Sequence, residues 1–107
     1  MNLATTDRNG TRIVTALESR IDAAGAIAFK DGVLSACDGA AGRVVLDLAR
    51  VDFLDSSGLG ALVALRQLLG AGRPLELAGL TPPVARVLRL TRMDTVFVIH
   101  PQAADAA

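Results

Sequence analysis

The order in which hydrophobic patterns alternate along the chain restricts its fold more than any other feature. Short apolar runs typical of buried strands occur at 43–51 (RVVLDLARV), 74–80 (PLELAGL) and 95–100 (TVFVIH). The first two are each followed by a segment with apolar residues at helical spacing. Strands and helices that alternate in this way form a sheet of parallel strands joined by right-handed helical crossovers. The chain is therefore predicted to be an α/β protein.

The N-terminal segment is expected to add an antiparallel hairpin to this sheet. Asn9 and Gly10 supply the two left-handed residues that a type I′ turn requires, and runs with strand character lie on both sides. The predicted order is β-β-α-β-α-β-α-β, followed by a short helical tail. Residues 1–107 are thus expected to form one domain, in which three to four helices pack on a mixed, mostly parallel sheet of four to five strands.

Three helices are predicted, over residues 21–39, 57–69 and from 81 to about 90. Thr81 is suited to the N-cap of the last one, and Pro82 to its first turn. In the middle helix, the aliphatic residues expected on the buried side are Leu59, Leu62, Val63 and Leu69.

The composition argues against several function classes. The 11 Lys and Arg residues balance 11 Asp and Glu residues, so no overall basic field attracts nucleic acid or an anionic membrane. Trp and Tyr are absent, which removes the usual platforms for stacking single-stranded nucleic acid. No run is long enough to span a membrane, and no secretion signal is recognised. Cys37, the only cysteine, is expected to fill the core. A cytoplasmic protein without nucleic-acid partners or membrane insertion is expected.

The polar stretch DFLDSSGLG, at 52–60, lies between a predicted strand and a predicted helix. In open α/β sheets the loops at the carboxyl ends of parallel strands form the functional edge. A second such loop contains Asp22, which should therefore lie near Ser56 in space. Capping of the helix, at about 1 kcal/mol, accounts for one hydroxyl. It does not explain Gly58 and Gly60 in the first turn, which indicate that another molecule approaches the backbone closely.

Nucleotide binding and serine hydrolysis are both poorly supported by this stretch. A dinucleotide-binding fingerprint has the pattern G-x-G-x-x-G. Gly58 and Gly60 match its first two glycines, but Val63 occupies the position of the third. A nucleophile elbow needs glycine two residues before the serine, where Ser56 has Leu54. The only histidine, His100, ends the last predicted strand, and we expect it to be an ordinary surface residue. The chain is predicted to be no enzyme and to use no cofactor or metal.

A third hypothesis is that a serine of this stretch is itself the substrate of a modifying enzyme. A phosphate at a helix N-terminus adds about −1.5 to −2 charges and meets N–H donors and the positive end of the helix dipole. Asp22 and Asp55 would repel it. Phosphorylation is therefore expected to change the surface field and the affinity for a partner more than the fold.

Residues 44–100 resemble the STAS-domain anti-sigma-factor antagonists. Their signature is an apolar strand, the motif D-S-[ST]-G-L-G and a helix, and the chain matches it at Asp55, Ser56, Ser57, Gly58, Leu59 and Gly60. The resemblance implies that Ser56 is phosphorylated, with Ser57 as second choice. It also implies that Asp22 and the other residues of the motif contact the partner.

The resemblance further implies a cycle of partner switching. The unphosphorylated form would bind an anti-sigma factor and so release a sigma factor. This anti-sigma factor would be a serine kinase of the histidine-kinase-like ATPase type, and its phosphorylation of Ser56 would switch binding off. A metal-dependent serine phosphatase would restore the unphosphorylated form.

One part of the family pattern differs in this chain. The family has G-E-L-D at the end of the second strand, whereas residues 19–22 read SRID, so Arg20 reverses a charge. The alternative function is that of a STAS subunit that binds without regulatory phosphorylation, as in a lipid-transport ABC complex or another signalling assembly.

Two surface features have open interpretations. Gly60, Ala61 and Ala64 either reflect helix propensity or form a low-relief face beside Ser56 on which a partner could lie. Three arginines that recur every third residue, Arg86, Arg89 and Arg92, are expected to form a solvated face.

Overall fold

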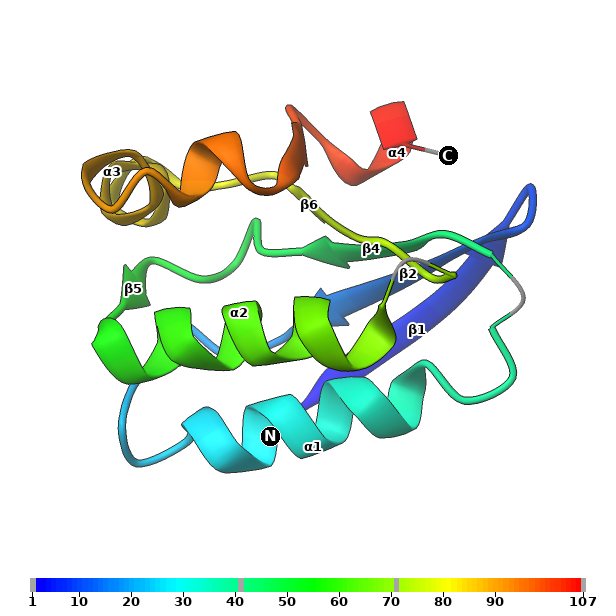
Figure 1. Cartoon of the computed structure of the whole chain (residues 1–107), viewed down its shortest axis with the longest axis horizontal. Coiled ribbons are helices and arrows are strands. Elements are labelled where there is room, and N and C mark those ends of the chain that lie inside the picture. The colour runs from blue at the N-terminus through cyan, green and yellow to red at the C-terminus, as the bar shows by residue number, and fades with distance from the viewer. Residues whose placement is uncertain (1, 41, 71, 107) are drawn as a thin grey trace.

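A computed structural model describes residues 2–40, 42–70 and 72–106, and these form the predicted α/β architecture (Figure 1). The main sheet has five strands in the order β1-β2-β4-β6-β7. Their bounds are β1 Leu3–Arg8, β2 Thr11–Ala16, β4 Val44–Asp47, β6 Leu75–Ala78 and β7 Val98–His100. The helices are α1 Ala26–Ala36, α2 Ser56–Leu69, α3 Pro82–Leu90 and α4 Ala103–Ala106, with a 3-10 turn at Met93–Thr95.

The N-terminal hairpin is confirmed. Asn9 and Gly10 connect β1 to β2 with φ angles of 53° and 79°, both in the left-handed region that a type I′ turn requires. β1 runs antiparallel to β2, and the other strands of the main sheet are parallel to their neighbours. The sheet is therefore mixed and mostly parallel, as expected.

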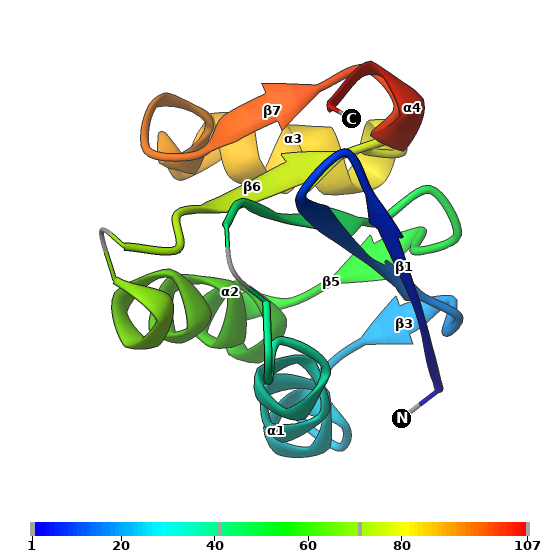
Figure 2. The ribbon, with the colours of Figure 1, turned by 90° about the vertical axis from the view of Figure 1, so that its right-hand side faces the viewer.

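The helices cover the two faces of the sheet unequally (Figures 1 and 2). α1 and α2 lie side by side on one face, and the short α4 lies on the other. β4 is buried on both faces: Val44 and Leu46 belong to the large core under α1 and α2, and Val45 belongs to a smaller cluster with Ala106 of α4. Burial on both faces explains why the sequence of this central strand is apolar without alternation.

Cys37 lies one residue beyond α1 and is fully buried in the large core. Burial raises the pKa of its thiol, so the protonated, apolar form is favoured. The expectation that this cysteine fills the core is confirmed.

The buried side of α2 differs from the predicted one. Leu62 and Leu69 are buried as expected, but Leu59 and Val63 are only half-buried. The buried residues of α2 are Gly58, Ala61, Leu62, Leu65 and Leu69. Small residues allow the closest approach of a helix to its neighbours, so the buried side is turned toward Gly58 and Ala61. Ala61 therefore belongs to the core, with only 6% of its surface exposed.

Two further details differ at the C-terminal half. Thr81 is the N-cap of α3, but its hydroxyl donates to the Val51 carbonyl oxygen at 2.6 Å instead of accepting from the helix. The last strand begins at Val98 and not at residue 95, because the preceding residues form the 3-10 turn.

Candidate functional site

Two very short strands bring the two polar loops together. β3 (Arg20–Ile21) pairs in parallel with β5 (Phe53–Leu54), and the Asp55 amide, just beyond β5, donates to the Ile21 carbonyl oxygen at 3.4 Å. The segments that carry Asp22 and Ser56 are thus neighbours, as expected. This strand pair was not predicted, because two residues are too few to produce a periodic signal.

The Asp55 carboxylate connects these loops. Its Oδ1 atom accepts from the Gly58 amide at 3.0 Å, which makes Asp55 the N-cap of α2. Its Oδ2 atom accepts from the Ala23 amide at 3.1 Å, in the loop before α1. The expectation that capping would account for a serine hydroxyl is wrong, because the carboxylate fills that role.

Asp55→Ala is expected to destabilise the fold by about 1–2 kcal/mol, since it removes a helix cap and a second hydrogen bond to a charged group. Asp55→Asn should cost less, because an amide oxygen can still cap α2 while its NH2 group faces the Ala23 N–H. Denaturant unfolding measures both. The control Asp52→Ala changes an exposed side chain and should lie within about 0.5 kcal/mol of wild type. Equal stability of Asp55→Ala and Asp52→Ala would contradict the assigned role.

Ser56 and Ser57 are the first two residues of α2, and both are exposed. Neither hydroxyl has a hydrogen-bond partner among the residues that the structure describes. They lie at the positive end of the helix dipole. Both hydroxyls are thus accessible, and neither stabilises the described part of the chain through a hydrogen bond.

The two glycines of the motif have different surroundings. A Cβ atom at Gly58 would lie 2.4 Å from the Ile21 carbonyl oxygen and 2.6 Å from Leu54 Cδ1. The group that approaches Gly58 closely is therefore the chain's own strand β3, and not another molecule as expected. A Cβ at Gly60 would meet nothing within 4 Å, so this second glycine borders open space.

The remaining candidates are less exposed than the serines. Leu59 is half-buried and packs against the large core. Asp22 is also half-buried, and its Oδ2 atom lies 3.4 Å from Nε of Arg20. The Arg20 guanidinium lies 4.1 Å from the centroid of the Phe53 ring. The arginine that departs from the family pattern thus connects the ends of β3 and β5.

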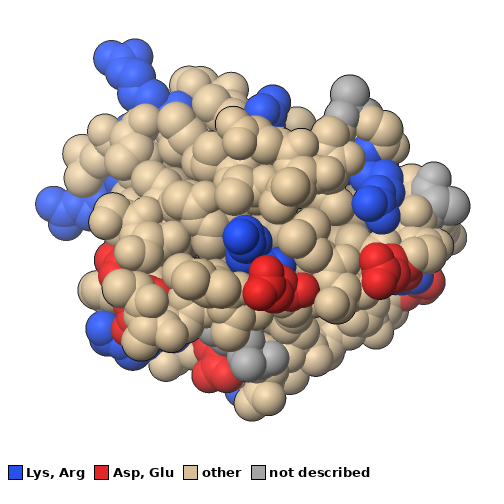
Figure 3. All heavy atoms as spheres, turned by 60° about the horizontal axis from the view of Figure 1, so that its bottom comes forward, with Lys and Arg blue, Asp and Glu red and all other residues tan. Residues whose placement is uncertain are grey.

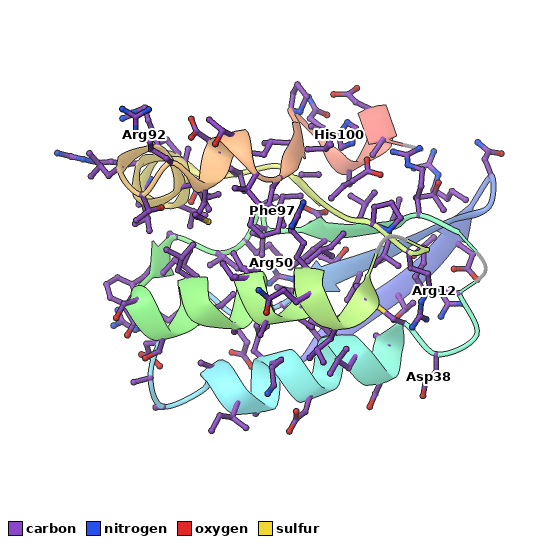
Figure 4. The ribbon with its side chains drawn as sticks, in the orientation of Figure 1. Arg12, Asp38, Arg50, Arg92, Phe97 and His100 are labelled. Carbon is purple, nitrogen blue, oxygen red and sulfur yellow. The ribbon has the colours of Figure 1, made fainter. Side chains whose placement is uncertain are left out.

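His100 ends β7 as expected, but its side chain is only partly exposed. Its side chain is 20% exposed, and Nε2 lies 2.6 Å from Oε1 of Glu76. Figure 4 places His100 near α4, away from α1 and α2. Glu76 is also bound by Arg43, at 2.7 Å and 2.8 Å. Sequence reasoning missed this cluster, because a glutamate between Leu75 and Leu77 resembles an ordinary exposed position of a strand.

Residues 2–40, 42–70 and 72–106 contain neither a metal-binding cluster nor a membrane-spanning helix. No group of three or more His, Cys, Asp and Glu side chains is arranged to hold a metal ion. No helix in the same ranges combines the length and the hydropathy that crossing a membrane requires.

Comparison with known families agrees with this arrangement. The sequence profile of the family described as "Mlab, STAS domain" matches residues 4–100, which is nearly the whole chain. The chain belongs to the STAS-domain family. The motif in this STAS domain, residues 55–60, lies inside the matched range and comprises the N-cap of α2 and its first five residues.

Solved structures share the fold over almost the full length of the chain. An anti-sigma factor antagonist from Mycobacterium paratuberculosis is 28% identical, with a TM-score of 0.85 over 98% of this chain and 89% of that one. A STAS-domain protein from Planctomyces limnophilus is 21% identical, with a TM-score of 0.86 over 97% and 93%. The Bacillus cell fate determinant SpoIIAA, in its phosphorylated form, is 18% identical, with a TM-score of 0.67 over 98% and 96%.

Proposed function

We propose that this STAS domain is an anti-sigma-factor antagonist whose binding to an anti-sigma factor is switched off by phosphorylation of Ser56. The observation that carries the proposal is the environment of Ser56. Its hydroxyl is exposed at the start of α2, and the neighbouring Asp55 carboxylate already caps the helix. A kinase can therefore modify Ser56 without removing a hydrogen bond that the fold uses.

The electrostatics favour an effect on binding over an effect on folding. A phosphate at Ser56 would carry about two negative charges. It would lie at the N-terminus of α2, where the positive end of the helix dipole stabilises negative charge. The Asp55 carboxylate is fixed by two backbone amides, and Asp22 lies on the neighbouring loop. The added phosphate would combine with these groups into a strongly negative surface, which weakens binding to an acidic partner.

Two of the similar proteins support this proposal. The Mycobacterium paratuberculosis protein is an anti-sigma factor antagonist, and SpoIIAA has been solved in a phosphorylated form. We propose a serine kinase of the histidine-kinase-like ATPase type as the partner and a metal-dependent phosphatase for the reverse step. The chain itself would act in the cytoplasm as a binding protein and not as an enzyme.

Ser56→Asp is expected to weaken binding to the cognate anti-sigma kinase at least about tenfold, while Ser56→Ala keeps the wild-type affinity. Calorimetry with each purified histidine-kinase-like ATPase of the source genome measures this. Ser35→Asp, on the exposed side of α1, is the matched control and should leave the affinity unchanged.

Incubation with the kinase and ATP, followed by peptide mass spectrometry, should place the phosphate on Ser56. Phosphate on Thr81, on Ser35 or on no residue would contradict the proposal. Binding that Ser56→Asp leaves unchanged would instead assign the chain to the STAS subunits that bind without phosphorylation.

A further inference from the structure

A groove runs between α1 and α2, next to the motif. It has a volume of about 310 Å³. Its α2 side consists of small residues, its α1 side contains one large aliphatic and one basic residue, and a serine of the motif lies at one end. The small residues of α2 are Gly60, Ala61 and Ala64, the aliphatic and basic residues of α1 are Ile27 and Lys30, and the serine is Ser57.

The groove is open because no side chain of the described chain fills it. Gly60 borders empty space, since an added Cβ would meet nothing within 4 Å. Ile27, at the edge of this apolar hollow, is 73% exposed. Figure 3 shows this side of the molecule, where uncharged residues cover most of the surface. An apolar partner surface would remove Ile27 and the groove from water.

Lys30 determines the charge that such a partner must bring. It is the only lysine in the sequence and the only charged residue of the groove. Its side chain is half-buried, and it forms no ion pair within residues 2–40, 42–70 and 72–106. Covering an unpaired ammonium group is costly, so a partner that covers the groove must pair with it. The complementary group is a carboxylate.

We propose that this groove receives an amphipathic helix of the anti-sigma factor, which packs aliphatic side chains against α2 and places a carboxylate on Lys30. The partner's identity rests on the proposed function. A helix suits a groove between two helices that lie side by side. The lining residues of α2 extend from Ser57 to Ala64, about 10 Å along the helix axis, so the groove can contact about two turns of a partner helix.

This placement explains how phosphorylation would act on binding. Ser57 lies at the end of the groove, and Ser56 precedes it at the start of α2. A phosphate on Ser56 would thus be added beside a helix that carries its own carboxylate for Lys30. Repulsion between the two negative groups would release the helix, and the groove itself would keep its shape.

A charge-swap titration tests the groove without the natural partner. Three synthetic helical peptides carry the same alanine and leucine face and differ only in Glu, Gln or Lys at the position facing Lys30. Titration into labelled protein is followed by amide NMR shifts. We expect shifts along α1 and α2, with the Glu peptide about fivefold tighter than the Lys peptide. In Lys30→Glu this preference should reverse. Shifts on other elements, or no preference between the peptides, would overturn the proposal.

Matched variants provide the second measurement. Ile27→Asp should reduce Glu-peptide binding at least about tenfold. Leu90→Asp is the matched control. Leu90 lies on α3 and is 72% exposed, compared with 73% for Ile27, and its substitution should leave peptide affinity unchanged. Thermal unfolding checks that both variants fold. Equal loss of peptide affinity in both variants would overturn the proposal. So would NMR shifts of the groove residues that depend on protein concentration in the absence of peptide, because a second copy of the chain would then occupy the groove.

The same variants separate this proposal from the proposed function. If an anti-sigma kinase binds wild type and responds to Ser56→Asp but not to Ile27→Asp or Lys30→Glu, the groove proposal fails and the function stands. If no such kinase binds wild type, the proposed function fails. The peptide series still decides whether the groove binds an acidic helix.

Discussion

Gly58→Ala is expected to destabilise the fold by about 2–3 kcal/mol, as overpacking in a close contact does. The added methyl group would lie 2.4 Å from the Ile21 carbonyl oxygen. This oxygen belongs to β3 and accepts from the Asp55 amide, so it can move only by disturbing the β3–β5 pair. Helix propensity alone predicts the opposite sign, since alanine is favoured over glycine by about 1 kcal/mol inside a helix. Denaturant unfolding therefore decides between the two effects.

Gly60→Ala is the matched control for this prediction. It lies two residues further along α2, where an added Cβ meets nothing within 4 Å. It should stabilise the protein by about 0.5–1 kcal/mol, because only helix propensity acts there. If both substitutions stabilise the fold equally, the close contact at Gly58 has no energetic importance.

The order of the main elements could be predicted because each has a strong local signal. Asn9 and Gly10 specify the hairpin turn, and the apolar run from Val44 to Leu46 matches a strand buried on both faces. The pair of β3 and β5 has no such signal. It depends on the Ile21 carbonyl oxygen and the Asp55 amide, which come together only in the folded chain.

The sequence predicted that the loops carrying Asp22 and Ser56 would be neighbours, but it did not identify the residue that caps α2. Asp, Ser and Ser are all good N-caps, so the sequence left open which residue caps α2, and a shift of one residue changes the answer. The spacing of Asp55 and Gly58, from N-cap to third helical position, is the signal that could have identified the carboxylate. The groove at Ile27 and Lys30 was missed, because it exists only where α1 lies beside α2.

On the sheet face opposite α1 and α2, Glu76 forms a charged cluster with no predicted counterpart. It is 7% exposed and lies beside Val45, which packs in the smaller cluster with α4. Two hydrogen bonds from Arg43 and a further one with His100 hold the pKa of the Glu76 carboxyl below its ordinary value of 4.5, although burial opposes this shift. The ionised form is therefore bound more tightly in the folded state than in the unfolded chain.

Glu76→Gln is expected to lower the free energy of unfolding by about 2 kcal/mol at neutral pH, since it weakens hydrogen bonds to a charged group. A carboxyl group with a lowered folded pKa stabilises the fold above its unfolded pKa, and this contribution is lost as pH falls through the folded pKa. The difference between wild type and variant should thus shrink below about pH 4. Denaturant unfolding at several pH values measures it. Asp31→Asn, an exposed acid on α1, should show no difference at any pH. A loss in Glu76→Gln that stays constant with pH would mean that Glu76 acts through packing and not through its charge.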